Sequence, residues 1–270
     1  MKTIQILLII VVTFFLGSIA CKEASKGSLK NEVTVKSDSI VKEDKEFITS
    51  DNIKIKANFF YSSLKHKQSE PLVILIHQFR SDKSQWTRDF VDSLVKSGFK
   101  VIAYDIRSHG ESDKAPVAID KLLSDKEQAP KDLQAVFGWA RSADGVNEGI
   151  DSSRIAVVGT SIGGSLAFYA KYYLGAKTIV GISVGKYTFE NLTDIRDILM
   201  GRVIERIRSV FLICGDKDGN YAAESKDIYD NYVDDPKEFK VFSSDKHGKY
   251  LIEEKPEIKS LVLNWLRRNL

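Results

Sequence analysis

Residues 154–164 read Arg-Ile-Ala-Val-Val-Gly-Thr-Ser-Ile-Gly-Gly, and this stretch decides the fold. The β-branched residues within 154–158 predict a short buried strand. The residues that follow, 162–174, are mostly small or helix-compatible and predict a helix. Between the two elements lies Ser161, flanked by Gly159 and Gly163, where larger side chains would collide with the turn and with the crossing helix. The stretch therefore predicts a strand, a sharp turn and a helix, with the Ser161 hydroxyl held clear of the sheet.

The serine at the centre of this turn needs a base before it can act as a nucleophile. A serine hydroxyl reacts when a base takes its proton, and a carboxylate orients that base. Of the four histidines in the chain, only His247 follows Ser161. His247 comes directly after the strand-like residues 238–242, and the loops at the carboxyl ends of strands hold the site residues of open α/β sheets. The sequence therefore predicts His247 as the base.

Two carboxylates are candidates for the acid that orients this base. Asp216 and Asp218 follow the apolar strand predicted at 209–214, and both lie between Ser161 and His247 in the sequence. A carboxylate at the end of a strand is well placed to orient a base on a neighbouring loop. The residues alone leave both candidates open.

The same segment partly matches the opening of a calcium-binding loop. Asp216, Asp218 and Asn220 have the D-x-D-x-N spacing of such a loop. However, Tyr221 occupies the position that needs glycine, and Asp227 replaces the closing glutamate. The mismatch argues against a metal site, and the sequence indicates no cofactor.

Strands and helices are predicted to alternate along most of the chain. After a hairpin at 47–61, strands are predicted at 72–76, 100–105, 154–158, 178–184, 210–214 and 239–242, and helices at 86–97, 131–141, 162–174, 194–207, 222–232 and 252–268. This alternation indicates an α/β fold: a mostly parallel sheet with an antiparallel N-terminal hairpin and helices on both faces. The connection at 185–209 has room for about one helix and turns, and 113–130 is typical of a loop with a short helix. We therefore expect no large cap.

The motifs described so far resemble those of the α/β-hydrolase superfamily, over residues 47–270. The resemblance rests on five segments, at 77–79, 105–112, 159–163, 215–218 and 247–248. Among the subgroups, compact serine hydrolases similar to dienelactone hydrolases and acyl peptidases are the nearest. The resemblance implies a catalytic triad of Ser161, Asp218 and His247, because Gly-x-x-Asp after this strand is usual in the family. Asp216 remains the alternative acid.

The resemblance also implies an oxyanion hole made of two backbone N–H groups. One is that of Ile162, at the start of the helix, where the helix dipole favours negative charge. The other is that of Phe79, in the loop after the strand at 72–76. Relatives usually have glycine where this chain has Gln78, and glycine adopts backbone angles that glutamine adopts less readily. We expect His77 to support this loop by hydrogen bonding.

The N-terminal segment predicts export. Met1 and Lys2 precede an apolar run at 4–16, and small residues follow, so residues 1–20 are typical of a secretory signal peptide. The segment ending in Cys21 resembles a bacterial lipoprotein lipobox, although Ser18 departs from it. We expect lipidation at Cys21 and a tether at 21–46, rich in Lys, Ser and Glu, that is disordered. The alternatives are ordinary cleavage, giving a secreted or periplasmic protein, and an uncleaved anchor.

The charge and the cysteine content bear on which partners the chain binds and on whether it forms a disulfide. The chain has 40 Lys and Arg against 37 Asp and Glu, interspersed, so nothing indicates binding to nucleic acid. With Cys21 lipidated, only Cys214 remains, which excludes an intramolecular disulfide. Cys214 ends an apolar strand and is expected to be a buried, inert thiol.

The sequence thus predicts a lipid-anchored serine hydrolase of the bacterial cell envelope. Its predicted reaction is cleavage of a small-molecule carboxylic ester or thioester through an acyl-enzyme intermediate. One alternative is a peptidase or amidase with the same three residues. The other is a non-catalytic envelope module that binds a ligand on a hydrolase fold.

Overall fold

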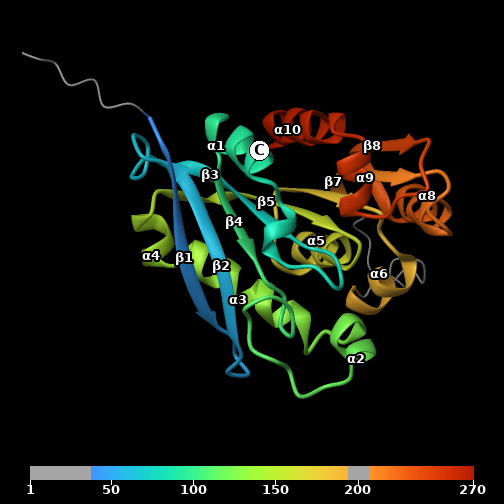
Figure 1. The fold of residues 1–270 in the computed structure, drawn as a ribbon, viewed down its shortest axis with the longest axis horizontal. Coiled ribbons are helices and arrows are strands. Elements are labelled where there is room, and N and C mark those ends of the chain that lie inside the picture. The colour runs from blue at the N-terminus through green and yellow to red at the C-terminus, as the bar shows by residue number, and fades with distance from the viewer. Residues whose placement is uncertain (1–37, 194–206) are drawn as a thin grey trace, which may run out of the picture. The chain divides into compact units, whose positions relative to one another are not determined.

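The computed structural model describes residues 38–193 and 207–270, which are drawn in colour in Figure 1. The predicted signal peptide, Cys21 and most of the predicted tether lie outside the described residues. The same holds for nearly all of the helix predicted at 194–207.

The described residues form one eight-stranded sheet. Its strands are β1 (Ile40–Ile48), β2 (Lys54–Ser62), β3 (Glu70–Ile76), β4 (Lys100–Tyr104), β5 (Ile150–Thr160), β6 (Thr178–Ile182), β7 (Ile207–Gly215) and β8 (Val233–Phe242). They lie in the order β1-β2-β4-β3-β5-β6-β7-β8. The pairs β1–β2 and β2–β4 are antiparallel, and all the other pairs are parallel. The predicted fold class, with its antiparallel N-terminal hairpin, is therefore confirmed.

Helices cover both faces of this sheet (Figure 1). One face packs against α1 (Arg88–Lys96), α9 (Lys249–Glu254) and α10 (Glu257–Asn269). The other packs against α2 (Ile119–Ser124), α3 (Ala129–Arg141), α5 (Ile162–Tyr173), α6 (Lys186–Leu192) and α8 (Tyr221–Tyr232), with α4 (Ala143–Asn147) against α3. Alternate residues of β3 enter the two cores: Leu72, Ile74 and Ile76 on one side, Val73 and Leu75 on the other. Such a strand is apolar throughout because both of its faces are buried.

Two predicted boundaries need correction. Strand β1 begins at Ile40, before the predicted start of the domain at residue 47, so the predicted tether includes part of a strand. Residues 42–46 are all charged, and exposed side chains alternate with partly buried ones among them because only one face of this strand is turned to solvent. The predicted closing helix is two helices, α9 and α10, separated at Lys255 and Pro256. Proline has no N–H to continue the hydrogen bonds of α9.

The connections that could carry a cap over the carboxyl edge of the sheet contain only short helices in the part that the structure describes. Between β6 and β7 the described residues form one short helix, α6, and between β4 and α3 they form loops and the short helix α2. None of the helices that the structure describes combines the length and hydropathy needed to cross a membrane. The loops after β3, β5, β6, β7 and β8 all leave from the same edge of the parallel strands, and the predicted site residues lie on these loops.

Candidate active site

Ser161 lies at a strained turn between β5 and α5. Its backbone has φ 52° and ψ −117°, a conformation that a residue other than glycine rarely adopts. The Ser161 N–H donates to the Ile182 carbonyl at the end of β6, at 2.8 Å. Thr160 and Ile162 are buried on either side, whereas Ser161 is partly exposed. The turn therefore presents the serine side chain at the carboxyl edge of the sheet.

The two glycines of this turn are required by close backbone contacts. A Cβ atom on Gly159 would lie 2.1 Å from the carbonyl carbon of Gly163. A Cβ atom on Gly163 would lie 2.3 Å from the carbonyl oxygen of Ile76, at the end of β3. Helix α5 thus begins in direct contact with two neighbouring strands, which confirms the predicted reason for the G-x-S-x-G pattern.

His247 and Asp218 form a hydrogen-bonded pair at the same edge. The Nδ1 atom of His247 lies 2.9 Å and 3.1 Å from the two carboxylate oxygens of Asp218. The side chain of Asp218 is 7% exposed and that of His247 is 27% exposed. A carboxylate that accepts from Nδ1–H leaves Nε2 as the unprotonated nitrogen of the neutral ring. The pair therefore presents a base at Nε2.

Asp216, the alternative acid, has a different role. Its Oδ1 accepts from the N–H of Ser244 at 2.9 Å, and its own N–H donates to the Phe242 carbonyl at 2.8 Å. Both partners lie at the start of the loop that carries His247. Asp216 therefore supports this loop, and Asp218 is the acid that contacts the histidine.

The loop of His247 packs against the serine turn. A Cβ atom on Gly248 would lie 3.5 Å from Cβ of Thr160, the residue before Ser161. Within the described residues the Ser161 hydroxyl makes no hydrogen bond. In unliganded enzymes the bond between nucleophile and base is often long and tightens when substrate binds. The structure thus joins Asp218 to His247 and places the neighbours of Ser161 and His247 in contact.

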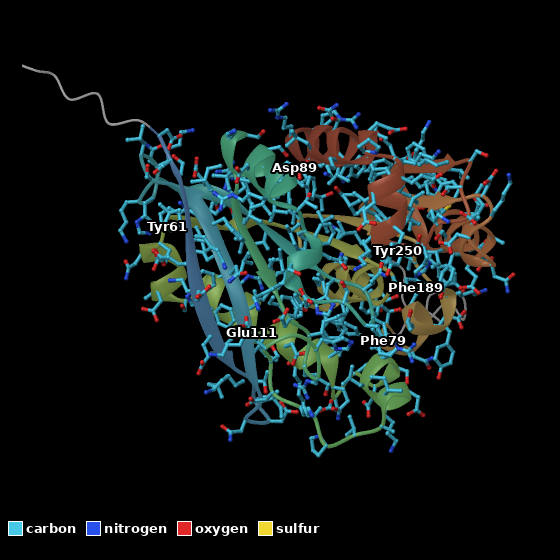
Figure 2. The ribbon with its side chains drawn as sticks, viewed as in Figure 1. Tyr61, Phe79, Asp89, Glu111, Phe189 and Tyr250 are labelled. Atoms are coloured by element: carbon cyan, nitrogen blue, oxygen red, sulfur yellow. The ribbon has the colours of Figure 1, made fainter. Side chains whose placement is uncertain are left out.

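The two predicted oxyanion donors lie on adjoining elements. The N–H of Ile162 is at the first turn of α5, where backbone donors have no partner within the helix. Phe79 follows β3, and in the described part of the chain its N–H donates no hydrogen bond. The start of α5 contacts this loop, because a Cβ atom on Gly163 would lie 2.8 Å from the His77 carbonyl oxygen. Figure 2 shows Phe79 on the same side of the view as Tyr250 of α9, the helix that follows His247.

Comparison with solved structures matches this architecture. The esterase Pf2001 of Pyrococcus furiosus is 24% identical, with a TM-score of 0.65 over 85% of this chain and 93% of that one. The acetyl xylan esterase of Paenibacillus sp. R4 is 16% identical, with a TM-score of 0.64 over 88% and 86%. A family model for the alpha/beta hydrolase fold matches residues 71–173. The protein has the α/β-hydrolase fold.

Two curated proteins are similar to part of this chain. An uncharacterised 31.7 kDa protein of Escherichia coli, from the traX-finO intergenic region, is 32% identical over 101 residues, which are 37% of this chain and 32% of that protein. The quorum-quenching protein AidA of Acinetobacter baumannii strain MDR-ZJ06 is 30% identical over 94 residues, which are 35% of this chain and 28% of that protein. The matched part thus spans about a third of each relative's length.

His77 supports the loop that carries Phe79, as predicted. Its Nε2 accepts from the Ile106 N–H at 2.9 Å, and its Nδ1 donates to the Gln78 carbonyl at 2.8 Å. The side chain is fully buried, and this burial lowers the pKa of His77 to about 4. A neutral ring that both donates and accepts holds the loop in place and is not available as a base.

The segment 105–112 supports the same region. Asp105 accepts from the backbone N–H of Lys83 and from its Nζ, each at 2.7 Å. Buried Arg107 pairs with Asp132 at 2.7 Å. Ser108, where the family usually has glycine, has φ 65°, in the left-handed region that glycine adopts most readily. These contacts fit the expected structural role of this turn.

Two contacts, one of the base and one of the residue after it, were not predicted from the sequence. The ring of Tyr221, at the start of α8, lies 4.2 Å from the ring of His247 between centroids. The hydroxyl of Ser183, after β6, accepts from the N–H of Gly248 at 3.0 Å. Neither residue belongs to a recognisable motif. Tyr221 was visible in the sequence only as a mismatch to a calcium loop.

A metal ion and a cysteine nucleophile, two other kinds of catalytic group, find no support in the described residues. Among the described residues, no cluster of three or more His, Cys, Asp or Glu side chains is arranged to hold a metal ion. Cys214 is fully buried at the end of β7, and burial raises the pKa of its thiol to about 12. It is therefore the inert thiol that was predicted.

Proposed function

We propose that this α/β-hydrolase is a serine hydrolase that cleaves carboxylic esters or thioesters of small molecules. The observation that carries the proposal is the Asp218–His247 pair, held at the sheet edge where Ser161 lies at a strained turn. Backbone strain of this kind persists where a function requires it. The esterases among the similar folds are in keeping with this reaction class.

The proposed reaction proceeds through an acyl-enzyme. Nε2 of His247 takes the proton of the Ser161 hydroxyl as Oγ attacks the carbonyl carbon, and Asp218 stabilises the imidazolium that forms. The N–H groups of Ile162 and Phe79 would hold the oxyanion. The imidazolium then protonates the leaving alcohol or thiol. A water molecule, activated by His247, releases the acid and restores Ser161.

The exposure of this edge favours accessible ester or amide substrates over long acyl chains that need a buried channel. Ser161 and His247 are both partly exposed, and residues 38–193 and 207–270 form no large cap over them. A peptidase or amidase would use the same three residues, so rates on matched ester and amide substrates separate the two reactions. A binding module would hydrolyse neither.

The test is hydrolysis of p-nitrophenyl esters of graded acyl length by the purified protein and its Ser161→Ala variant. We expect the variant to lower kcat by about 10⁴- to 10⁶-fold. A Ser243→Ala variant, which changes an exposed serine outside the proposed machinery, is the matched control and should keep wild-type rates. Equal turnover by the wild type and Ser161→Ala would refute the proposal. Absence of activity, together with no labelling of Ser161 by a fluorophosphonate, would favour the binding module.

We also propose that the mature protein begins at Cys21 and is anchored to a membrane of the bacterial envelope by lipid on that residue. The support is the signal-like sequence at 1–20 and the small residues before Cys21. Several acyl chains on one residue would give stable anchoring. Incorporation of a labelled fatty acid in the producing cells, lost in a Cys21→Ser variant, tests this. Labelling that persists in the variant would contradict it.

A further inference from the structure

The loop after β3, residues 77–80, carries the proposed oxyanion donor Phe79 and is called the oxyanion loop below. Gln78 is the residue at which this loop departs from the usual glycine, and its side chain is buried and hydrogen-bonded. Only 7% of Gln78 is exposed. Its Oε1 accepts from the backbone N–H of Lys249 at 2.7 Å, across 171 residues of sequence. A Cβ atom on Gly248 would lie 2.1 Å from this Oε1, so the glycine there leaves the space that the Gln78 amide occupies. The oxyanion loop is thus joined to the turn directly after His247.

The backbone of Gln78 is joined to the serine turn. The Gln78 N–H donates to Oε1 of Gln85 at 3.0 Å. The Nε2 of Gln85 donates to Oγ1 of Thr160 at 2.9 Å. Thr160 is fully buried and directly precedes Ser161. Two glutamine side chains therefore link the loop after β3 to the loops after β5 and β8.

These links select which N–H of the oxyanion loop remains free. Because the Gln78 N–H is engaged by Gln85, the N–H of Phe79 is the next one along the loop that can face an oxyanion. On the other side, two consecutive N–H groups after His247 are held: that of Gly248 by Ser183 and that of Lys249 by Gln78. A shift of either loop would break a hydrogen bond between buried or partly buried groups.

We propose that Gln78 is a positioning residue that fixes the oxyanion donor of Phe79 relative to the base His247. The inference rests on the proposed function, since it concerns the same site. Gln78 touches no reacting atom in this account and acts through the two loops. Misplacement of a catalytic group by about 1 Å can lower the rate about 10²-fold, so a hydrogen bond that joins oxyanion donor and base has its main effect on kcat.

The experiment compares Gln78→Met with Gln134→Met in p-nitrophenyl ester hydrolysis by the full chain. Methionine keeps the length of the side chain and removes the acceptor for Lys249. Gln134 is an exposed glutamine of α3 that bonds Tyr169, so its variant is the matched control. We expect Gln78→Met to lower kcat about 10- to 100-fold with KM within about twofold. Labelling of Ser161 by a fluorophosphonate should slow in parallel, and Gln134→Met should match the wild type.

A second variant tests the other end of the link. Gln85→Met removes the acceptor for the Gln78 N–H, so it should give the same selective loss of kcat. In the double variant the losses should be less than multiplicative, because both changes act on one loop. If Gln78→Met does not fold, as judged by its melting temperature, the Gln85→Met result decides.

Three outcomes would overturn the proposal: kcat within twofold of wild type in the folded variants, a raised KM with unchanged kcat, or fully multiplicative losses. A raised KM would mean that Gln78 contacts the substrate. Failure of the proposed function is recognised separately, because then Ser161→Ala would retain activity, or the wild type would show neither activity nor labelling of Ser161. An inactive Ser161→Ala beside a fully active Gln78→Met refutes only the role of Gln78.

Discussion

Two turns at the carboxyl edge of the sheet have nearly the same backbone conformation but different residues. Ser161, before α5, has φ 52° and ψ −117°, and Gly248, before α9, has φ 55° and ψ −114°. Glycine adopts these angles without steric strain, whereas serine does so at a cost of about 1 to 3 kcal/mol. The turn at Gly248 therefore has a residue that adopts its backbone angles without strain. The turn at Ser161 instead keeps a strained residue, whose hydroxyl the proposed reaction needs.

The two turns also differ in what holds them. The serine turn is fixed by contacts with its own strand and with its neighbours β3 and β6, through Gly159, Gly163 and the N–H of Ser161. The glycine turn is held by side chains from distant loops, Gln78 and Ser183. The first arrangement relies mainly on backbone atoms of adjacent strands, and the second relies on side chains from other loops.

The largest expected effect is on kcat and comes from changing Asp218, the acid beside the glycine turn. Asp218→Asn should lower kcat about 10⁴-fold, because the amide no longer holds His247 in the tautomer with a free Nε2. Asp216→Asn is the matched control, since its carboxylate contacts only the Ser244 backbone, and kcat should fall less than about tenfold. The measurement is kcat on one p-nitrophenyl ester, and equal losses in the two variants would contradict the assignment of Asp218.

The choice between these two aspartates shows where sequence alone stops. Both follow the same strand and precede His247, so the residues left both open, and only the resemblance favoured Asp218. The structure separates them because Asp216 is bound to the backbone at the start of the histidine loop, in a contact between loops far apart in sequence. The serine turn, in contrast, was predictable because its glycines and flanking elements are contiguous.

The role of Gln78 and the position at which β1 begins could not be predicted from the sequence, for related reasons. In the sequence Gln78 is only a departure from glycine, and its partner Lys249 lies in another part of the chain. The charges of residues 42–46 suggest a solvated tether, yet they lie on an edge strand paired with β2. The composition of a segment does not show which distant residues that segment will contact in the folded protein.

The next effect concerns the space at the glycine turn. Gly248→Ala should lower the free energy of unfolding by about 2 to 3 kcal/mol, from left-handed strain and from displacement of the buried Gln78 amide. Gly175→Ala is the control, because Gly175 has φ 66° and its nearest neighbour would be the Arg141 side chain at 3.6 Å. It should lose about 1 kcal/mol, from strain alone. Equal losses in urea denaturation would show that Gln78 does not restrict Gly248.

A smaller effect is expected from His77, in the loop that contacts both turns. It is a dependence of the free energy of unfolding on pH. His77 has its pKa lowered from 6.5 to about 4 by burial, so between these values the unfolded chain binds a proton that the folded one does not. The stability due to neutral His77 is thus complete above pH 6.5 and is lost as pH falls toward 4. Between pH 7 and 5 this amounts to about 2 kcal/mol. Urea denaturation of wild type and His77→Gln at both pH values measures the difference, and an identical pH slope would contradict it.

The smallest effect compares the two turns directly. Ser161→Gly gives the serine turn the residue of the glycine turn, and should raise the free energy of unfolding by about 1 kcal/mol as strain is relieved. Ser161→Ala also removes the hydroxyl but keeps a Cβ atom at the same angles, so it should not gain this stability. Ser243→Gly, at an exposed residue without a positive φ, should lose stability. If urea denaturation finds Ser161→Gly no more stable than Ser161→Ala, the serine turn is not strained. The backbone angles that it shares with the Gly248 turn would then carry no cost in free energy.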